Sequence, residues 1–364
     1  MAVATNRNSR RTAMILGATG LASAGLFGVK SAFAINPLDI IPDYANVTPR
    51  TVMITGANTG IGRAAAEQLC TAGHSVIVVC RTIVKAQKTI EEIKATFGDK
   101  VTGNLIPLEC DVSDLDSVRR LVRDFRDLNL PLNVLVANAG ISLNAQEKGD
   151  EFTQRSKDGF ELTIATNYLG HFLLTNLLLP DLEKSGSDSR IVITGSEVHD
   201  PSSPGGSVGP GATLGDLSGL KSKAPMVDGG PYDADKAYKD SNHVFMLELQ
   251  RRLKAKGVTV TANSFGPGLI TRSAFFKNQN GLFSRLFDFA TNDIFHVAET
   301  VDFGGACLSY MALSKDLEGK GGLWLNAVQP GKPVFEQLQP SIEARDTKKA
   351  KMLYDMSLEA VGLA

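Results

Sequence analysis

Residues 51–62 read Thr-Val-Met-Ile-Thr-Gly-Ala-Asn-Thr-Gly-Ile-Gly, which places a glycine turn directly after a short apolar run. The apolar run is typical of a buried strand, and residues 63–69 after the turn are typical of a helix. Glycines let the backbone approach a pyrophosphate, and the free N–H groups of a helix N-terminus attract an anion. The stretch therefore predicts a dinucleotide-binding turn formed by Gly56, Asn58, Thr59, Gly60, Ile61 and Gly62.

The rest of the chain alternates between strand-like apolar runs and helix-like amphipathic stretches. We expect strands near residues 51–55, 75–80, 104–108, 133–138, 190–194, 258–264 and 322–326. We expect helices near residues 61–72, 83–97, 114–127, 158–184, 232–255, 297–313 and 342–360. This alternation predicts an α/β fold with a doubly wound parallel sheet of the Rossmann type. Residues 51–364 would form this single domain, with lid insertions and a C-terminal helix.

Residues 1–34 have the composition of a targeting segment: a basic start, an apolar glycine-interrupted run, and small residues at 31–34 that resemble a cleavage site. The pair Arg10-Arg11 resembles a twin-arginine signal, and Ser-Ala-Phe-Ala resembles the start of a plastid presequence. We expect delivery to a plastid, thylakoid-associated or lumenal, or to an exported compartment in a bacterium. An uncleaved membrane anchor is the alternative. The proline-containing residues 35–50 are expected to be a linker.

Composition limits the classes of partner. The 364 residues carry a formal net charge of −1, so no nucleic-acid partner is expected. The four cysteines and five histidines show no ligand spacing, which predicts reduced structural thiols and no metal site.

The Thr-Gly-x-x-x-Gly-x-Gly spacing of residues 55–62 resembles that of the short-chain dehydrogenase/reductase family. Further matches follow in the family's order: Asn138-Ala139-Gly140, Asn167, Ser196, a Tyr/Lys region at 232–242, and Pro267-Gly268. The resemblance covers residues 50–330 and implies an oxidoreductase that uses a nicotinamide cofactor.

The end of the second strand bears on the choice of cofactor. In NAD-binding folds an acidic residue there accepts hydrogen bonds from the ribose hydroxyls. Here the strand ends in Cys80-Arg81, and Arg81 can pair with a 2′-phosphate while Lys85 supports it one turn later. These residues predict NADP. The resemblance adds Asp111 and Val112 beside the adenine, Asn138, Ala139 and Gly140 beside the ribose, and Pro267 and Gly268 to the cofactor-binding set.

The resemblance also implies a catalytic set. In this family a tyrosine donates a proton, a lysine four residues on lowers its pKa, a serine orients the substrate, and an asparagine holds a water relay. Spacing of four places two side chains on one helix face, and a cation near a phenol favours the ionised form. Ser196 and Asn167 match the serine and the asparagine. A strand-end hydroxyl bonded to the backbone is the structural alternative for Ser196.

Two tyrosines compete for the role of proton donor. Tyr232 and Lys236 form the literal Tyr-x-x-x-Lys motif, but Tyr238 stands nearer the family's usual separation from Pro267. The residue four positions after Tyr238 is Asn242, which carries no charge. Both tyrosines stay candidates.

Within the family, residues 214–220, 226–230, 237–241 and 359–364 resemble the light-dependent protochlorophyllide oxidoreductases. In those enzymes the motif continues from Tyr-Lys-Asp-Ser into Lys, an apolar residue, Cys and Asn. Here Ser241 runs directly into Asn242, and Ala137 stands where those enzymes have another cysteine. The resemblance supports the lineage and the cofactor more than it supports that reaction.

We therefore expect an NADPH-dependent reductase of a bulky hydrophobic substrate, a tetrapyrrole of chlorophyll biosynthesis or a similar molecule. Six phenylalanines within residues 275–295 predict a lid on which a flat or polyene substrate stacks and which touches a membrane surface. A short helix packed into the core is the alternative for this segment. Two other functions stay open: a carbonyl or retinol-type dehydrogenase acting on an isoprenoid, and a catalytically silent NADP-binding protein associated with pigment. Homo-oligomerisation stays open as well.

Overall fold

A single sheet runs through the part of the chain that the structure describes. The computed structural model describes residues 34–142, 154–186, 188–203, 206–207, 211–218, 220, 234–271, 298–328 and 332–364, with the backbone alone for 234–240. The sheet has nine strands in the order β1-β9-β8-β7-β6-β5-β2-β3-β4. Strands β2 to β8 pair in parallel, whereas β9 pairs antiparallel with both β8 and the edge strand β1. The strands are β1 (Ala34–Ile35), β2 (Thr51–Thr55), β3 (Ser75–Cys80), β4 (Leu105–Glu109), β5 (Val134–Ala137), β6 (Arg190–Thr194), β7 (Thr261–Gly266), β8 (Trp324–Ala327) and β9 (Phe335–Leu338).

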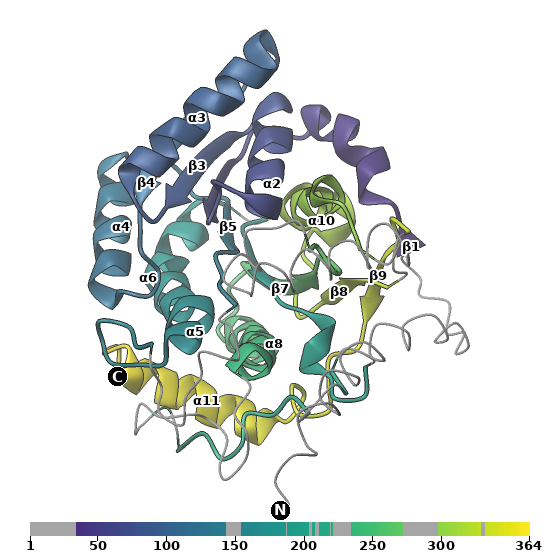
Figure 1. The fold of residues 1–364 in the computed structure, drawn as a ribbon. Coiled ribbons are helices and arrows are strands. Elements are labelled where there is room, and N and C mark those ends of the chain that lie inside the picture. Colours follow the sequence, from purple (N-terminus) through teal and green to yellow (C-terminus); the bar gives the residue numbers. More distant parts are fainter. Residues whose placement is uncertain are drawn as a thin grey trace, which may run out of the picture.

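Helices cover both faces of this sheet, with α2 and α10 side by side on one face (Figure 1). The first face is covered by α2 (Gly60–Thr71), α3 (Ile83–Phe97) and α10 (Val301–Leu313). The second is covered by α4 (Leu115–Asp127), α6 (Gly170–Lys184) and α8 (Ala234–Ala255), with α11 (Thr347–Ala360) packed against α8. Every residue of β2 and β5 is buried, as expected for parallel strands covered on both faces. The doubly wound fold is confirmed.

The connections include several short helical turns. They are η2 (Pro37–Asn46), η3 (Gly98–Lys100), η6 (Glu197–His199) and η9 (Lys315–Leu317), all of 3-10 type, together with α5 (Leu162–Ile164) and the π-helical turn η5 (Ala165–Leu169). The helix predicted over 158–184 is thus divided into α5, η5 and α6, and the strands β1 and β9 were not predicted. A π-turn inside a helical run is frequent at functional sites, and η5 contains Asn167.

Residues 35–50, predicted as a linker, are instead built into the domain. Pro37 lies in the first turn of η2, where its fixed backbone angle suits a helix start, and Asn36 caps that turn by accepting from the N–H of Leu38 at 3.2 Å. Tyr44 is buried, and η2 packs against α10. Prolines here start a helical turn rather than an extended spacer, which composition alone does not distinguish.

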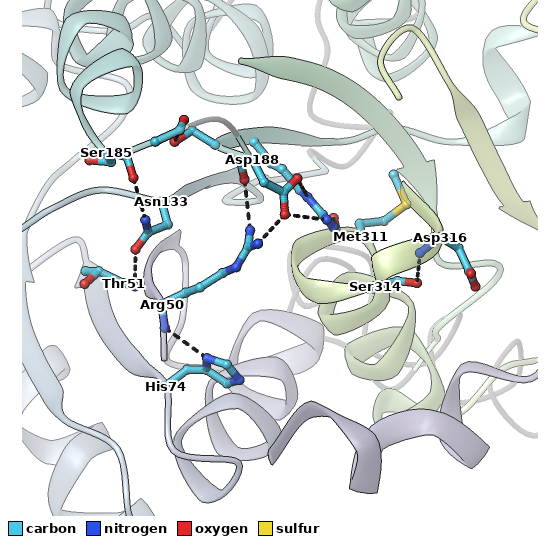
Figure 2. A network of polar contacts seen from close by, with 12 residues as sticks. Arg50, Thr51, His74, Asn133, Ser185, Asp188, Met311, Ser314 and Asp316 are labelled. Carbon is cyan, nitrogen blue, oxygen red and sulfur yellow. Dashed lines mark hydrogen bonds and ion pairs between the residues drawn. The ribbon is translucent and has the colours of Figure 1, made fainter. Parts of the chain in front are cut away.

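A buried ionic network fastens this segment to the amino ends of the strands (Figure 2). Both Arg50 and Arg190 pair with Asp188, and Arg190 also donates to the carbonyl of Met311 in α10 at 3.3 Å. The backbone N–H of Arg50 donates to Nδ1 of His74 at 3.1 Å. Arg190 is 1% exposed, so this network holds charge that would be costly to leave unpaired. It stabilises the amino ends of the strands, opposite the end that carries the glycine turn.

Three predicted features lie outside the described residues. They are the targeting segment up to residue 33, Tyr232, and the phenylalanine-rich residues 275–295. Among the described helices, the run Leu162–Lys184 is long and apolar enough to cross a membrane, but its most apolar window is 78% buried within the domain. It is accounted for as a core helix.

Candidate active site

The glycine turn lies at the carboxyl end of β2, between β5 and β3, where the strand order reverses. Such a switch point is where open α/β sheets bind their ligands. Gly56 and Gly60 have φ values of +69° and +57°, which favour glycine. A Cβ at Gly62 would lie 2.6 Å from Nδ2 of Asn138, so this helix start tolerates no side chain there.

The N-terminus of α2 is open to a ligand. Thr59 is its exposed N-cap residue and makes no side-chain capping bond, while Asn58 and Ile61 are half-buried beside it. The first N–H groups of this twelve-residue helix therefore keep their donors for an anion. The turn fits a dinucleotide pyrophosphate.

Arg81 stands at the carboxyl end of β3 with its side chain 60% exposed, and its Nε lies 3.8 Å from Oδ2 of Asp111. Such an exposed pair contributes little to stability, so the guanidinium can turn to a phosphate at small cost. Lys85 is exposed in the first turn of α3. Asp111 accepts from the N–H and the hydroxyl of Ser113, at 3.0 and 2.7 Å. The predicted 2′-phosphate site is therefore exposed and has two cations, with the Asp111 carboxylate beside Arg81.

Val112 contacts the start of α6, and Pro267-Gly268 lies near the start of α2. A Cβ at Gly170 would lie 1.8 Å from the carbonyl oxygen of Val112, so α6 begins in direct contact with the backbone there. Gly268 has a φ of +80°, and a Cβ at Gly304 in α10 would touch both Pro267 and Ile61. The segment after β7 therefore packs beside the start of α2.

Thr55 joins the glycine turn to the end of β5. Its hydroxyl accepts from the backbone N–H groups of Asn138 and Ala139 at 2.9 and 3.0 Å, and lies 2.9 Å from Nε2 of His171. In turn, Nδ2 of Asn138 donates to the carbonyl of Thr55 at 2.9 Å. These contacts fix the half-buried strand end that continues into Gly140.

His171 is fully enclosed between Thr55 and η5. Its Nδ1 lies 3.4 Å from the carbonyl oxygen of Asn167. Burial lowers the pKa of His171 to about 4. The ring is therefore neutral at physiological pH and serves as a hydrogen-bonding link rather than a charge.

Asn167 uses its side chain and its backbone in different ways. The side-chain amide pairs with the backbone of Ile141, accepting from its N–H and donating to its carbonyl, both at 2.9 Å. The main-chain carbonyl accepts from Nδ2 of Asn242 at 3.3 Å, and the same Nδ2 lies 3.1 Å from the carbonyl of Thr194. Asn242 thus holds α8 against both η5 and the end of β6.

Ser196 lies two residues beyond β6 and is half-buried. Its hydroxyl accepts from the N–H of Val198 at 3.5 Å and caps η6. This contact matches the structural alternative raised for a strand-end serine, but an acceptor role leaves the O–H able to donate to a ligand. The structure thus brings Ser196, Asn138 and Asn167 to one end of the sheet.

The tyrosine region is described only in part. Tyr238 and Lys236 lie on α8, for which the structure describes the backbone alone at these positions, and Tyr232 precedes the described part of that helix. Tyr238 stands one helical turn before Asn242. The choice between the two tyrosines stays a prediction.

The described ranges contain neither a metal-binding cluster nor an exposed thiol. Among those residues no group of three or more His, Cys, Asp or Glu side chains could hold a metal ion. The four cysteines are free and buried, and burial raises the pKa of Cys80 to about 11. These thiols therefore stay protonated and unreactive.

Comparisons with known proteins place the chain in a family. The family profile for short chain dehydrogenase matches residues 50–208. A chloroplastic protochlorophyllide reductase of Cucumis sativus is 37% identical over 323 residues, covering 86% of this chain and 78% of that protein. One from Chlamydomonas reinhardtii is 35% identical over 342 residues, covering 91% and 82%. The chain belongs to the short-chain dehydrogenase family.

A solved structure has a similar fold. An uncharacterized protein from Mycobacterium paratuberculosis superimposes with a TM-score of 0.59 at 27% identity, covering 88% of this chain and 97% of that one. As a short-chain dehydrogenase related to protochlorophyllide reductases over most of its length, this chain is an oxidoreductase that uses a nicotinamide nucleotide.

Several residues of this short-chain dehydrogenase site were not assigned from the sequence. Thr55 and His171 link the glycine turn to Asn167. His171 stands four residues after Asn167, and that spacing on a helical run is a signal that could have found it. Asn242 was noted only for lacking a charge, because its two carbonyl partners lie far away in sequence.

Proposed function

We propose that this chain is an NADPH-dependent reductase of a bulky, flat, hydrophobic substrate of the tetrapyrrole type, with protochlorophyllide as the first candidate. The observation that carries the proposal is the similarity to protochlorophyllide reductases, at 37% identity over 86% of the chain. Motifs outside the cofactor site, at residues 214–220 and 359–364, take part in that resemblance.

The preference for NADPH rests on the end of β3. Arg81 takes the place of the acidic residue that would receive the ribose hydroxyls of NAD, and its guanidinium is exposed beside the glycine turn. Lys85 adds a second cation one turn away. Arginine and phosphate form strong charge-assisted hydrogen bonds, so a 2′-phosphate would be favoured. When bound, the nicotinamide supplies the hydride.

The chain's own residues would manage the proton and the substrate. Ser196 would orient the substrate through its O–H, and Tyr238 would donate the proton from α8. The other candidate for the proton donor is Tyr232, which would have Lys236 as its partner. Asn167 would keep η5 in place through its bonds to Ile141. The neutral His171 and Thr55 would keep the strand ends in register behind them.

The composition of residues 269–296 suits a large substrate. Residues 269–296 contain six phenylalanines and follow Pro267-Gly268, where this family builds a lid. Aromatic rings of that density suit stacking on a flat or polyene molecule. The same rings would let the protein touch a membrane surface, from which such a substrate would arrive.

One observation favours a second candidate, a catalytically silent NADP-binding protein associated with pigment. One turn after Tyr238 stands Asn242, whose neutral amide donates to two main-chain carbonyls. That position therefore holds no cation that would lower the pKa of the Tyr238 phenol. A protein of this kind would bind cofactor and pigment without turnover.

A substrate panel separates these functions. The purified chain would be supplied with NADPH and, in turn, protochlorophyllide, retinal and a small polar aldehyde, in darkness and under illumination. We expect NADPH oxidation with protochlorophyllide, and the light arm reports whether light is needed. Turnover with retinal alone would favour the isoprenoid dehydrogenase. Tight binding of NADPH and pigment without oxidation would favour the silent binder.

The location would be a plastid. The relatives from Cucumis sativus and Chlamydomonas reinhardtii are chloroplastic, and residues 1–34 resemble a targeting segment. The twin-arginine-like pair would direct the chain to the thylakoid or its lumen. Fusion of residues 1–50 to a fluorescent protein, beside an Arg10→Lys and Arg11→Lys double variant, would test this delivery.

A further inference from the structure

Two histidines that the proposed reaction does not use lie directly behind Ser196. The rings of His199 and His243 pack against each other with centroids 3.8 Å apart and planes tilted by 36°, and both meet Trp324 edge-on. Both rings are buried, at 1% and 0% exposure. Burial lowers the pKa of each, so the pair is uncharged at neutral pH. Uncharged rings at this place act through hydrogen bonds and shape.

His199 connects two distant backbone groups. Its Nε2 lies 3.1 Å from the backbone N of Ser341, in the segment that leads into α11. A backbone N–H only donates, so Nε2 must be the acceptor and Nδ1 must carry the proton. Nδ1 therefore donates to the carbonyl oxygen of Ser196, at 2.7 Å. The hydrogen-bond partners fix this tautomer.

The residue before Ser196 is tied to β7, because the N–H of Gly195 donates to the carbonyl of Phe265 at 2.7 Å. Ser196 itself is contacted from η6 and from the two histidines. The bond from the N–H of Val198 to its hydroxyl is long, at 3.5 Å, and η6 is a single short turn. The His199 backbone N–H reaches the Ser196 carbonyl at 3.3 Å, so the imidazole supplies the shorter of the two bonds to that oxygen. A Cβ at Gly195 would lie 2.5 Å from Nε2 of His243, so the second ring fills the space behind the preceding residue.

We infer that His199 is a positioning residue for Ser196: its Nδ1–H anchors the serine's main chain, and its Nε2 ties that anchor to the C-terminal segment at Ser341. The inference rests on the proposed function, since it assigns the purpose of the anchor to the serine that orients the substrate. The ring of His243 packs against that of His199 and limits its movement.

Three variants separate the two bonds from the ring. His199→Asn keeps a donor near the Nδ1 position, His199→Gln keeps an acceptor near the Nε2 position, and His199→Phe keeps only the stacked ring. We expect His199→Gln and His199→Phe to lower kcat for protochlorophyllide by about tenfold or more, the scale set by a misplaced catalytic group. His199→Asn should retain most of kcat, and NADPH affinity should stay unchanged in all three.

His74 provides the matched control. It is equally buried and also bridges two backbone groups, Arg50 N and Tyr44 O, but at the opposite end of the strands. His74→Phe should lower Tm without lowering kcat. Equal losses of kcat in His199→Asn and His199→Phe, or full kcat in His199→Phe, would overturn the inference.

Imidazole nitrogen NMR of the wild-type full chain reads the bridge without relying on turnover. The expected signal for His199, assigned by its disappearance in His199→Asn, is the Nδ1–H tautomer at pH 7. An Nε2–H tautomer or a cation would overturn the bridge itself. A wild-type protein with no turnover on any substrate would overturn the proposed function and the positioning role, and the NMR result would still decide the bridge.

Discussion

The side-chain amide of Asn242 donates to the main-chain carbonyl of Asn167 at 3.3 Å, and this contact joins α8 to the π-turn η5. Nδ2 of Asn242 also reaches the carbonyl of Thr194 at 3.1 Å. In the short-chain dehydrogenase motif that begins at Tyr238, this position would carry the lysine. The chain thus fills the place of a cation with a neutral donor that satisfies two backbone acceptors.

Asn242→Lys should return a cation to this position. If Tyr238 donates the proton, the ammonium would lower the pKa of its phenol by about one unit or more, as an opposite charge at short range does. The high-pH limb of the kcat profile should then move to lower pH. A pH series from 6 to 11 would measure it, with Asn242→Gln as the neutral control. An unshifted high-pH limb in Asn242→Lys would contradict a proton donor close to residue 242.

Arg81→Ala should remove most of the preference for NADPH. One charge-assisted contact of roughly 1.5–3 kcal/mol corresponds to about tenfold or more in affinity, so the intact chain should bind NADPH at least that much tighter than NADH. Quenching of tryptophan fluorescence by each nucleotide would give the dissociation constants. Lys88→Ala, an exposed cation on α3 outside the predicted site, serves as control. Equal affinities in the intact chain would contradict the assignment of Arg81.

Tyr238→Phe should abolish turnover, whereas Tyr232→Phe should leave most of it. The reason is the position of Tyr238 one turn before Asn242, whose amide reaches η5 and the β6 end that leads to Ser196. Initial rates with NADPH and protochlorophyllide would decide between them, with NADPH affinity measured to confirm an intact cofactor site. The opposite pattern would assign the proton donor to Tyr232, with Lys236 as its partner.

Stability should fall in mild acid because His171 is buried without charge. Its pKa is lowered from 6.5 to about 4 on folding, so the unfolded chain binds a proton first as the pH falls. Its contribution is therefore complete above pH 6.5 and is lost toward pH 4, which amounts to about 2 kcal/mol between pH 7 and 5. Urea unfolding at both pH values would measure the loss.

His171→Gln, which does not titrate, is the comparison for that measurement. The variant should be less stable than the wild type at pH 7 but should lose less on acidification. An equal loss in both proteins would show that other groups, such as the buried His199 and His243, account for the acid sensitivity.

Local patterns predicted the doubly wound sheet and the glycine turn because each rests on residues that are neighbours in sequence. The strands β2 and β3 and the helix α3 have the predicted bounds, since apolar runs and helical periodicity define them directly. Residues 35–50 were misjudged because proline is compatible with both a spacer and a helix start.

The polar part of the site could be predicted only in part. Asn138, Asn167 and Ser196 were predicted from motif spacing, and the structure places them at one end of the sheet. The partners of Asn242 lie 75 and 48 residues away in sequence, and the bridge from His199 to Ser341 spans 142 residues. No local pattern encodes such pairs, because they exist only once the strands are ordered.

The most direct test of the account follows the hydride itself. NADPH deuterated at C4 of the nicotinamide would be incubated with the purified chain and protochlorophyllide, in darkness and under illumination, and the pigment analysed by mass spectrometry. The account predicts a reduced pigment that carries one deuterium, formed in step with NADPH oxidation and lost in Tyr238→Phe. Unchanged pigment and unoxidised NADPH in both conditions, with both molecules bound, would contradict it and leave a silent binding protein.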